Sequence, residues 1–230
     1  MGTGSVKNLA SRHHHSHGMG MTASSVRGKL LKELQQQGID DERVLQAMAR
    51  IPRHEFVEEA LKSDAYKNRA LPIGHAQTLS QPYVVALMTQ LLLADGPRKR
   101  VLEVGTGSGY QTAVLAELVD VVFSVERIRA LSQVARRRMQ SLGYRNVHFG
   151  YADGSLGWSP YAPYDGILVT AGSATVPDAL LKQLDRGGRM VIPVGPQGSQ
   201  SLRLIERTTH GLKQSDLAPV SFVPLLSGKS

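Results

Sequence analysis

The sequence predicts an α/β fold: a doubly wound, mostly parallel sheet with an antiparallel C-terminal edge and a helical N-terminal cap. Three observations carry this prediction. Short apolar runs alternate with helical segments from residue 101 onwards, which is typical of a parallel sheet covered by helices. A glycine-rich turn follows the first apolar run. The residues before that run have apolar side chains at helical spacing.

The N-terminal part of the chain predicts a leader followed by helices. Residues 1–24 are rich in Gly, Ser and His and have no hydrophobic period, so we expect a disordered leader or a tag. Residues 25–97 contain three apolar patterns at helical spacing. The first ends at Gly38, the second ends at Pro52, and the third, over 84–93, has the composition of a buried helix.

Residues 98–230 form the predicted core, which is Rossmann-like and makes one compact domain with residues 25–97. Parallel strands are predicted over 101–104, 121–125, 147–151, 166–169 and 190–194. The helices that connect them are predicted over 111–118, 128–142 and 177–184. The last two strands, over 202–206 and 220–223, are separated by turn residues around Gly211, so we expect an antiparallel pair at the sheet edge.

Composition excludes several kinds of site. The chain has 230 residues, and none of them is cysteine. This excludes a disulfide, a thiolate metal site and a cysteine nucleophile. The histidines of the core are scattered singly, so we predict no metal site. No apolar run approaches the roughly 18 residues of a membrane helix, and no secretory signal is recognisable.

The net charge of +8 leaves the kind of partner open. The densest basic run, Arg136–Arg138, lies on a predicted helix without interleaved aromatic residues. This pattern favours a solvated helix face over a nucleic-acid surface. We therefore expect a cytoplasmic monomer that binds neither membranes nor nucleic acid.

The glycine-rich turn lies in the segment VLEVGTGSG, residues 101–109. Glycines let the backbone approach a ligand closely, and a doubly wound sheet binds its ligand at such a strand-to-helix turn. Tyr110 occupies the position of the third glycine of the dinucleotide fingerprint, which therefore fails. Glu103, at the mouth of the loop, would repel a pyrophosphate but suits a cationic ligand. The loop therefore favours S-adenosylmethionine, which carries no phosphate.

Two further acids follow successive strands. Glu126 ends the second strand, where a carboxylate can accept hydrogen bonds from both ribose hydroxyls. Asp153 follows the third strand and is placed to reach the adenine amino group. Each acid alone is better explained as a turn or cap carboxylate, but three acids at successive strand ends favour a nucleoside site. The predicted cofactor-binding residues are Glu103, Gly105, Thr106, Gly107, Ser108, Gly109, Glu126, Asp153 and Gly154.

This arrangement resembles the class I S-adenosylmethionine-dependent methyltransferases, whose pattern is an acid, then G-x-G-x-G, then acids that end the next two strands. Methylation at pyrimidine C5 needs a cysteine, which is lacking. The turn after the fourth strand, residues 169–172, lacks the Asp/Asn-Pro-Pro-Tyr/Phe pattern of DNA amino-methyltransferases. An acceptor that is already nucleophilic at neutral pH, such as a carboxylate, needs only alignment and exclusion of water.

The stretch GHAQTLSQP, residues 74–82, is the candidate acceptor site. Ser80 lies at the start of a predicted helix, with Pro82 in its first turn. Two interpretations stand level on physical grounds: Ser80 is a helix N-cap, or its hydroxyl and the free amides bind a carboxylate.

The chain resembles the protein-L-isoaspartate O-methyltransferase family over residues 26–226. The matching segments are RALPIGHAQTLSQPYVVALMTQLL, VLEVGTGSGYQTAVLA, VFSVERI, YADGSLGW, PYDGILVTAG, LDRGGRMVIPVG and FVPLL. This resemblance implies that Ser80 is the catalytic residue and that Gln77, Thr78 and Val223 shape the substrate site. Ser221 departs from the arginine that bacterial relatives often have there.

The implied reaction moves a methyl group from S-adenosylmethionine to the free α-carboxylate of L-isoaspartyl residues in damaged proteins and peptides. The ester then closes to a succinimide, which initiates repair. Three alternatives remain: another class I enzyme that methylates a small-molecule oxygen or nitrogen, an NAD-dependent oxidoreductase, and a non-catalytic S-adenosylmethionine sensor or peptide-binding module.

Overall fold

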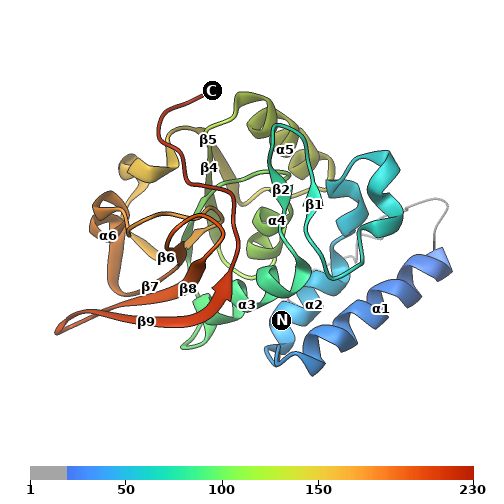
Figure 1. The fold of residues 1–230 in the computed structure, drawn as a ribbon, viewed down its shortest axis with the longest axis horizontal. Coiled ribbons are helices and arrows are strands. Elements are labelled where there is room, and N and C mark those ends of the chain that lie inside the picture. The colour runs from blue at the N-terminus through green and yellow to red at the C-terminus, as the bar shows by residue number, and fades with distance from the viewer. Residues whose placement is uncertain (1–19) are drawn as a thin grey trace, which may run out of the picture.

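A computed structural model describes residues 20–230 of the chain (Figure 1). The predicted leader therefore lies outside the described residues up to position 19. Residues 20–24 belong to the first helix, α1 (Gly20–Gln36). Its apolar face continues through Leu30 and Leu34, which are buried. The first helix thus begins at Gly20, before residue 25, where the predicted helical part of the chain starts.

In the rest of the N-terminal part, two further α-helices pack against α1, and two 3-10 helices and a small hairpin connect them. Their bounds are α2 (Glu42–Arg50), the 3-10 helices η1 (Arg53–Phe56) and η2 (Glu59–Asp64), β1 (Leu71–Pro72), β2 (Thr78–Leu79) and α3 (Pro82–Leu93). Asp41 caps α2 by accepting a hydrogen bond from the amide of Arg43. Pro82 opens α3, where the missing N–H has no cost. The α3 helix rests on the central sheet and so ties this part to the core.

The central sheet has seven strands in the order β5-β4-β3-β6-β7-β8-β9. Their bounds are β3 (Arg100–Val104), β4 (Val121–Glu126), β5 (Val147–Tyr151), β6 (Tyr164–Val169), β7 (Leu184–Val194), β8 (Gln200–Thr208) and β9 (Gly211–Val220). The strands from β5 to β7 are parallel, and β8 and β9 are antiparallel additions. The predicted doubly wound sheet with an antiparallel C-terminal edge is confirmed.

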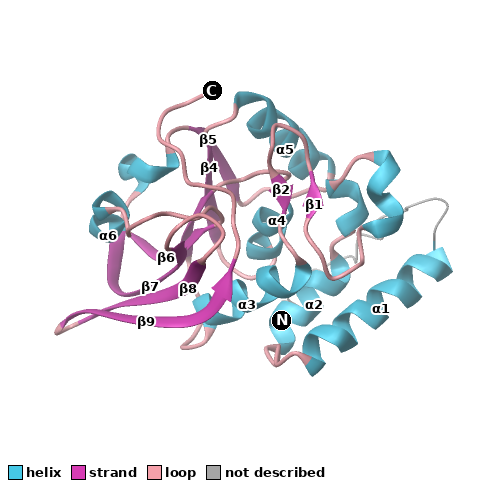
Figure 2. Cartoon of the chain, in the orientation of Figure 1, coloured by secondary structure: helices cyan, strands magenta, loops and turns pink. Residues whose placement is uncertain are grey.

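Helices lie on both sides of the sheet (Figure 2), and an apolar layer of side chains packs against each of its faces. The helices α3, α4 (Tyr110–Ala116) and α5 (Arg129–Ser141) cover one face. The helix α6 (Asp178–Gln183) and the short 3-10 helices near Trp158 cover the other. Alternate residues of each strand enter opposite layers, as Val101 and Leu102 do. The chain changes faces between β5 and β6, so the strand order reverses between β3 and β6, where such sheets bind ligands.

The last strand differs from the prediction. Strand β9 covers 211–220, whereas the sequence pattern predicted a strand over 220–223. Most of β9 is exposed on both faces, so it lacks the apolar alternation that marks a half-buried strand. The segment after β9 is not a strand, and it runs back across the sheet toward the carboxyl ends of the parallel strands (Figure 1).

Both open edges of the sheet carry features that oppose pairing with another strand. At the β5 edge, Arg136 of α5 donates a hydrogen bond to the carbonyl oxygen of Phe149 at 2.8 Å. At the β9 edge, Lys213 and Asp216 are charged, and Pro219 lacks an amide hydrogen. Charges, prolines and occupied backbone groups are common protections of an edge strand. Within residues 20–230, no helix combines the length and apolar character needed to cross a membrane.

Candidate active site

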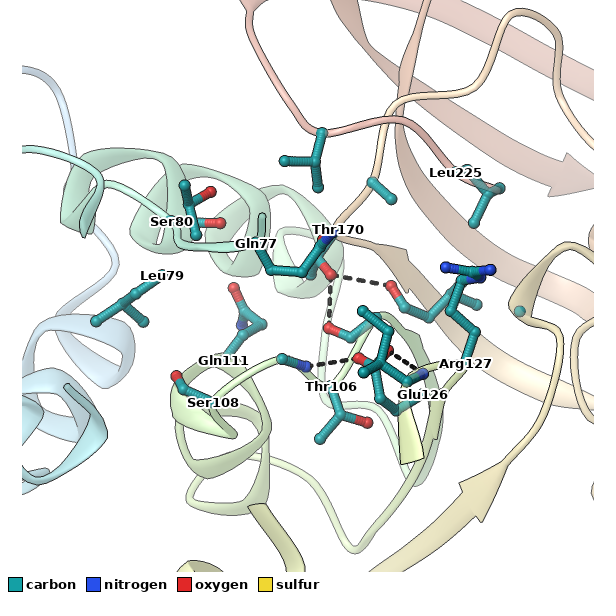
Figure 3. Close-up of a pocket in the computed structure, with 18 of the residues that line it drawn as sticks. Gln77, Leu79, Ser80, Thr106, Ser108, Gln111, Glu126, Arg127, Thr170 and Leu225 are labelled. Atoms are coloured by element: carbon teal, nitrogen blue, oxygen red, sulfur yellow. Dashed lines mark hydrogen bonds between the residues drawn. The ribbon is translucent and has the colours of Figure 1, made fainter. Parts of the chain in front are cut away.

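A cavity of about 820 Å³, part of it open to solvent, lies at the carboxyl ends of β3, β4 and β6. This is the point where the strand order reverses, which is where doubly wound sheets bind their ligands. Figure 3 shows Ser80 and Gln77 on one side of the cavity and Glu126 and Arg127 on the other. The predicted site residues that line it are Gln77, Thr78, Ser80, Gly105, Thr106, Gly107, Ser108, Glu126, Gly154 and Val223.

The glycine loop joins β3 to α4 and forms the floor of the cavity. Gly105 has a φ of 97°, a conformation that favours glycine. A Cβ atom there would lie 2.3 Å from the hydroxyl oxygen of Thr170, so the position also lacks space. That hydroxyl donates to the carbonyl oxygen of Gly105, at 2.6 Å. Thr170 follows β6, and it therefore ties the loop to the neighbouring strand. Gly109, the one predicted loop residue outside the cavity lining, packs its Cα side against Ala135 of α5.

Glu126 ends β4 and has 6% of its surface exposed. One carboxylate oxygen accepts the amide hydrogen of Gly107 and the other accepts that of Ile128, each at 2.9 Å. An ionised carboxylate has about four acceptor positions, so two remain for a ligand. This arrangement fits the predicted contact with two ribose hydroxyls.

Ser108 offers a second indication that the cavity holds a polar ligand. Its hydroxyl oxygen is buried and has no hydrogen-bond partner within residues 20–230. Buried hydroxyls are nearly always paired, so an unpaired one beside a cavity indicates a partner that binds there. The glycine loop, the Glu126 carboxylate and this hydroxyl together fit a nucleoside linked to an amino acid.

Ser80 lies just before α3 and lines the cavity. The N-cap of α3 is Gln81, and no side chain caps the helix. The N-cap interpretation of Ser80 is therefore wrong. The backbone carbonyl of Ser80 is held by Arg53, whose Nη2 donates to it at 2.9 Å. The hairpin that carries Gln77 and Thr78 precedes it, and two residues at its tip, His75 and Ala76, have φ near 50°.

The segment after β9 closes the site from the opposite side. The amide of Gly172 donates to the carbonyl of Val223 at 2.8 Å, and the amide of Leu225 donates to Gly172 at 2.7 Å. These bonds fix the segment against the loop that follows β6. Val223 consequently lines the cavity, together with Leu225 and Leu226.

Glu103 lies below the cavity rather than in its lining. It shares a face of β3 with Val101 and points under α4, where it is fully buried. Its carboxyl accepts hydrogen bonds from the hydroxyls of Thr112 and Ser124, both at 2.5 Å. Burial raises the pKa of Glu103 from 4.5 to about 8, although these hydrogen bonds oppose the shift and the nearby Glu126 adds to it. Glu103 thus supports the loop from beneath, and the predicted contact with the methionine end of the cofactor stays a prediction.

Asp153 also lies outside the lining, whereas Gly154 is within it. The Asp153 carboxylate caps the 3-10 helix that begins at Gly154, accepting the amide and hydroxyl hydrogens of Ser155. It also accepts the amide hydrogen of Gly228 at 2.5 Å. Burial favours the neutral acid, but these hydrogen bonds hold the pKa of Asp153 below its usual value. The carboxylate thus ties the C-terminal segment to β5, and the predicted adenine contact stays a prediction.

Sequence reasoning missed Arg53 and Thr170. The signal for Arg53 was a basic residue inside the apolar segment IPRHEF, residues 51–56, because a buried arginine needs specific partners. Thr170 was seen only as part of a turn. Within residues 20–230, no three His, Asp or Glu side chains gather as metal ligands.

Comparison with known proteins places this geometry among methyltransferases. The family described as protein-L-isoaspartate(D-aspartate) O-methyltransferase matches residues 25–230. A protein-L-isoaspartate O-methyltransferase of Halorhodospira halophila is 53% identical over 95% of this chain and 99% of its own. That of Pseudomonas aeruginosa is 55% identical over 90% of this chain and 99% of its own.

Solved structures give the same picture. A protein-L-isoaspartate O-methyltransferase structure has a TM-score of 0.78 and 31% identity, and the match covers 86% of this chain and 65% of that one. A second, from Plasmodium falciparum in complex with S-adenosyl-L-homocysteine, has a TM-score of 0.75 and 25% identity, covering 87% of this chain and 98% of that one.

Proposed function

The chain belongs to the protein-L-isoaspartate(D-aspartate) O-methyltransferase family, and from this we propose that Ser80 orients the substrate α-carboxylate toward the methyl donor. The methyl donor is S-adenosyl-L-methionine, and the acceptor is an L-isoaspartyl residue of a damaged protein or peptide. The observation that carries the proposal is the position of Ser80, which lines the cavity and whose side chain caps no helix.

When bound, S-adenosylmethionine would supply an electrophilic methyl group to the carboxylate oxygen, and the electron pair of the broken C–S bond would stay on its sulfur. Glu126 is proposed to accept both ribose hydroxyls, because both of its oxygens are positioned by backbone amides and retain acceptor capacity. Ser108 is proposed to bind the methionine end through its unpaired hydroxyl. Gly154 lines the cavity, and a Cβ atom there would lie 2.4 Å from Val104, so only glycine fits this close to β3.

The chemistry needs no general base in this chain. A carboxylate is already ionised at neutral pH and its oxygen is a sufficient nucleophile once it is aligned with the methyl group. Ser80 donates a hydrogen bond that fixes one carboxylate oxygen, which directs the other toward the donor. The segment from Gln77 to Ser80 and the loop at Val223 line the cavity from different elements and keep water from the reacting atoms.

The site must accept isoaspartyl residues in many sequence contexts. Gln77 and Thr78 belong to a short hairpin and Val223 belongs to a loop, so two segments from different parts of the chain line the cavity. Backbone contacts are independent of substrate side chains. We infer that these two segments bind the main chain around the damaged residue, and that Ser221, beside Val223, alters peptide contacts without taking part in the chemistry.

The test is a methyl-transfer assay with labelled S-adenosylmethionine and two peptides of one sequence, one isoaspartyl and one aspartyl. Labelling of the isoaspartyl peptide alone, followed by slow release of the label as the ester closes to a succinimide, supports the proposal. Equal or absent labelling of the two peptides would refute it. Labelling of a small-molecule oxygen or nitrogen in their place would identify another class I methyltransferase.

We further propose that the enzyme acts as a cytoplasmic monomer and binds no nucleic acid. One chain supplies every proposed element of the site, from Ser80 before the sheet to Val223 after it. Sedimentation at several protein concentrations tests the monomer, and fractionation of cells tests the compartment. Retention on immobilised nucleic acid at physiological salt would contradict the last expectation.

A further inference from the structure

Two arginines bind two of the segments that line the cavity. Arg53 of η1 donates from Nη2 to the carbonyl oxygen of Ser80 at 2.9 Å. Arg138 of α5 donates from Nη1 to the carbonyl oxygen of Ser108 at 2.6 Å. Both serines line the cavity, and neither arginine does. Each arginine therefore acts on the site through a backbone carbonyl rather than by touching a ligand.

The two arginines are linked to each other by two aromatic rings. The guanidinium carbon of Arg53 lies 4.6 Å from the ring centroid of Tyr110. The ring of Tyr110 meets that of Phe56 edge to face, with 5.4 Å between centroids. The guanidinium carbon of Arg138 lies 5.4 Å from the Phe56 centroid. These four side chains, Arg53, Tyr110, Phe56 and Arg138, form what we term the arginine–aromatic bridge.

The bridge is costly to bury, which argues against a role in packing alone. Arg53 has 1% of its surface exposed, and within residues 20–230 no acidic side chain forms an ion pair with it. Its Nε binds the carbonyl oxygen of Ala65 at 2.7 Å, but its buried Nη1 has no partner among those residues. A buried charge without a counter-ion and a buried donor without an acceptor both destabilise the fold.

We propose that the arginine–aromatic bridge is the device that sets the distance between Ser80 and the glycine loop, which makes Arg53 and Arg138 positioning residues for methyl transfer. This proposal rests on the role proposed above for Ser80. Guanidinium suits the task because it is planar, stacks on a ring and still donates hydrogen bonds from its edge. Lysine carries the same charge but cannot combine stacking with a fixed donor direction.

The step that depends on the bridge is alignment. The nucleophilic oxygen and the methyl carbon must meet in line, and a displacement of about 1 Å can reduce the rate by about 100-fold. Ser80 holds the acceptor and Ser108 lies in the loop that holds the donor. A shift of either carbonyl against the other therefore changes the rate of the chemical step more than the binding of either ligand.

Arg53→Lys and Arg138→Lys test the proposal, and Arg100→Lys is the matched control. Arg100 lies 4.9 Å from the Phe123 ring centroid and also donates to backbone carbonyls, but at the opposite end of β3 from the cavity. For each variant we would measure kcat and KM with the isoaspartyl peptide, the dissociation constant of S-adenosylmethionine, and Tm. Arg138 is only half-buried, so we expect Arg138→Lys to fold even if Arg53→Lys does not.

We expect kcat to fall about tenfold or more in both bridge variants, while KM and the cofactor dissociation constant change less than about threefold. The control should keep its kcat even where its Tm falls. The double variant should lose less than the product of the single effects, because both residues act on one distance. An unchanged kcat at Arg138→Lys, or losses confined to Tm or cofactor binding, would overturn the proposal. Ser80→Ala in the same assay tests the role of Ser80 separately.

Discussion

The amide of Gly107 donates a hydrogen bond to the carboxylate of Glu126 at 2.9 Å, which fixes the glycine loop to the end of the neighbouring strand. The acid that is proposed to bind the ribose therefore also sets the shape of the loop that binds the rest of the cofactor. The glycine loop and Glu126 form one preorganised unit. Both follow strands of the central sheet, whereas Ser80 follows the β1–β2 hairpin.

Replacing Glu126 by alanine should weaken the binding of S-adenosylmethionine and leave the rate of methyl transfer from bound cofactor nearly unchanged. Hydrogen bonds to a charged group contribute about 1.5–3 kcal/mol each, so the dissociation constant of S-adenosylmethionine should rise about 10- to 100-fold or more. Titration calorimetry measures it directly. Glu117→Ala, which removes a carboxylate paired with Arg50 away from the cavity, is the control. If both variants bound S-adenosylmethionine with the same affinity, Glu126 would not be a cofactor-binding residue.

Replacing Ser80 by alanine should have the opposite effect. The hydroxyl is proposed to fix the acceptor carboxylate, so kcat should fall by about 100-fold or more, whereas cofactor affinity should stay close to that of the unchanged protein. Single-turnover methyl transfer measures the first quantity and calorimetry the second. Ser141→Ala, on the surface of α5, is a suitable control. If cofactor binding collapsed, Ser80 would have to be regarded as a structural residue.

Glu103 should give the protein an unusual dependence on pH. Its pKa rises from 4.5 in the unfolded chain to about 8 in the folded protein, so the folded state binds this proton more tightly. Its contribution to the free energy of unfolding is therefore full below the lower value and is lost as the pH rises toward the upper one.

The neutral variant Glu103→Gln isolates that contribution. The difference in free energy of unfolding between the original protein and the variant should shrink from about pH 5 to about pH 8. Urea unfolding at a series of pH values measures this difference, and other carboxylates cancel because both proteins contain them. A difference that stays constant across this range would show that the Glu103 carboxyl is ionised throughout.

The tip of the β1–β2 hairpin should gain stability from glycine. Ala76 has a φ of 53°, a left-handed conformation that costs a residue with a Cβ atom about 1–2 kcal/mol. Ala76→Gly should therefore raise the free energy of unfolding by about 1 kcal/mol. Ala130→Gly, on the exposed side of α5, should lower it by about 0.5–1 kcal/mol. Urea unfolding of both variants shows whether their changes in the free energy of unfolding have opposite signs.

Much of this architecture follows from local patterns, and the exceptions have identifiable causes. Strands β3, β4 and β6 are buried on both faces along most of their length, so their apolar runs are clear in the sequence. Strand β9 is exposed on both faces and leaves no such pattern. The loop and Glu126 were predictable because a strand that ends at a ligand is marked by the glycine or acid that follows it.

Positions that depend on packing between distant segments were not predictable. Glu103 occupies the face of β3 that α4 covers, and only the layer arrangement reveals that its side chain points away from the cavity. Arg53 reaches Ser80 across 27 residues of sequence, and no local period marks such a contact. Asp153 meets Gly228, 75 residues later, because the C-terminal segment folds back over the sheet.

The features that oppose strand pairing at the β5 and β9 edges matter for an enzyme whose substrates are damaged proteins. Damaged proteins can expose strands that have lost their native partners. An unprotected edge could pair with such a strand, and the two proteins would then aggregate. The hydrogen bond from Arg136 to Phe149 occupies one acceptor at the β5 edge, and Pro219 withholds a donor at the β9 edge. Each edge therefore offers such a strand fewer free backbone groups with which to pair.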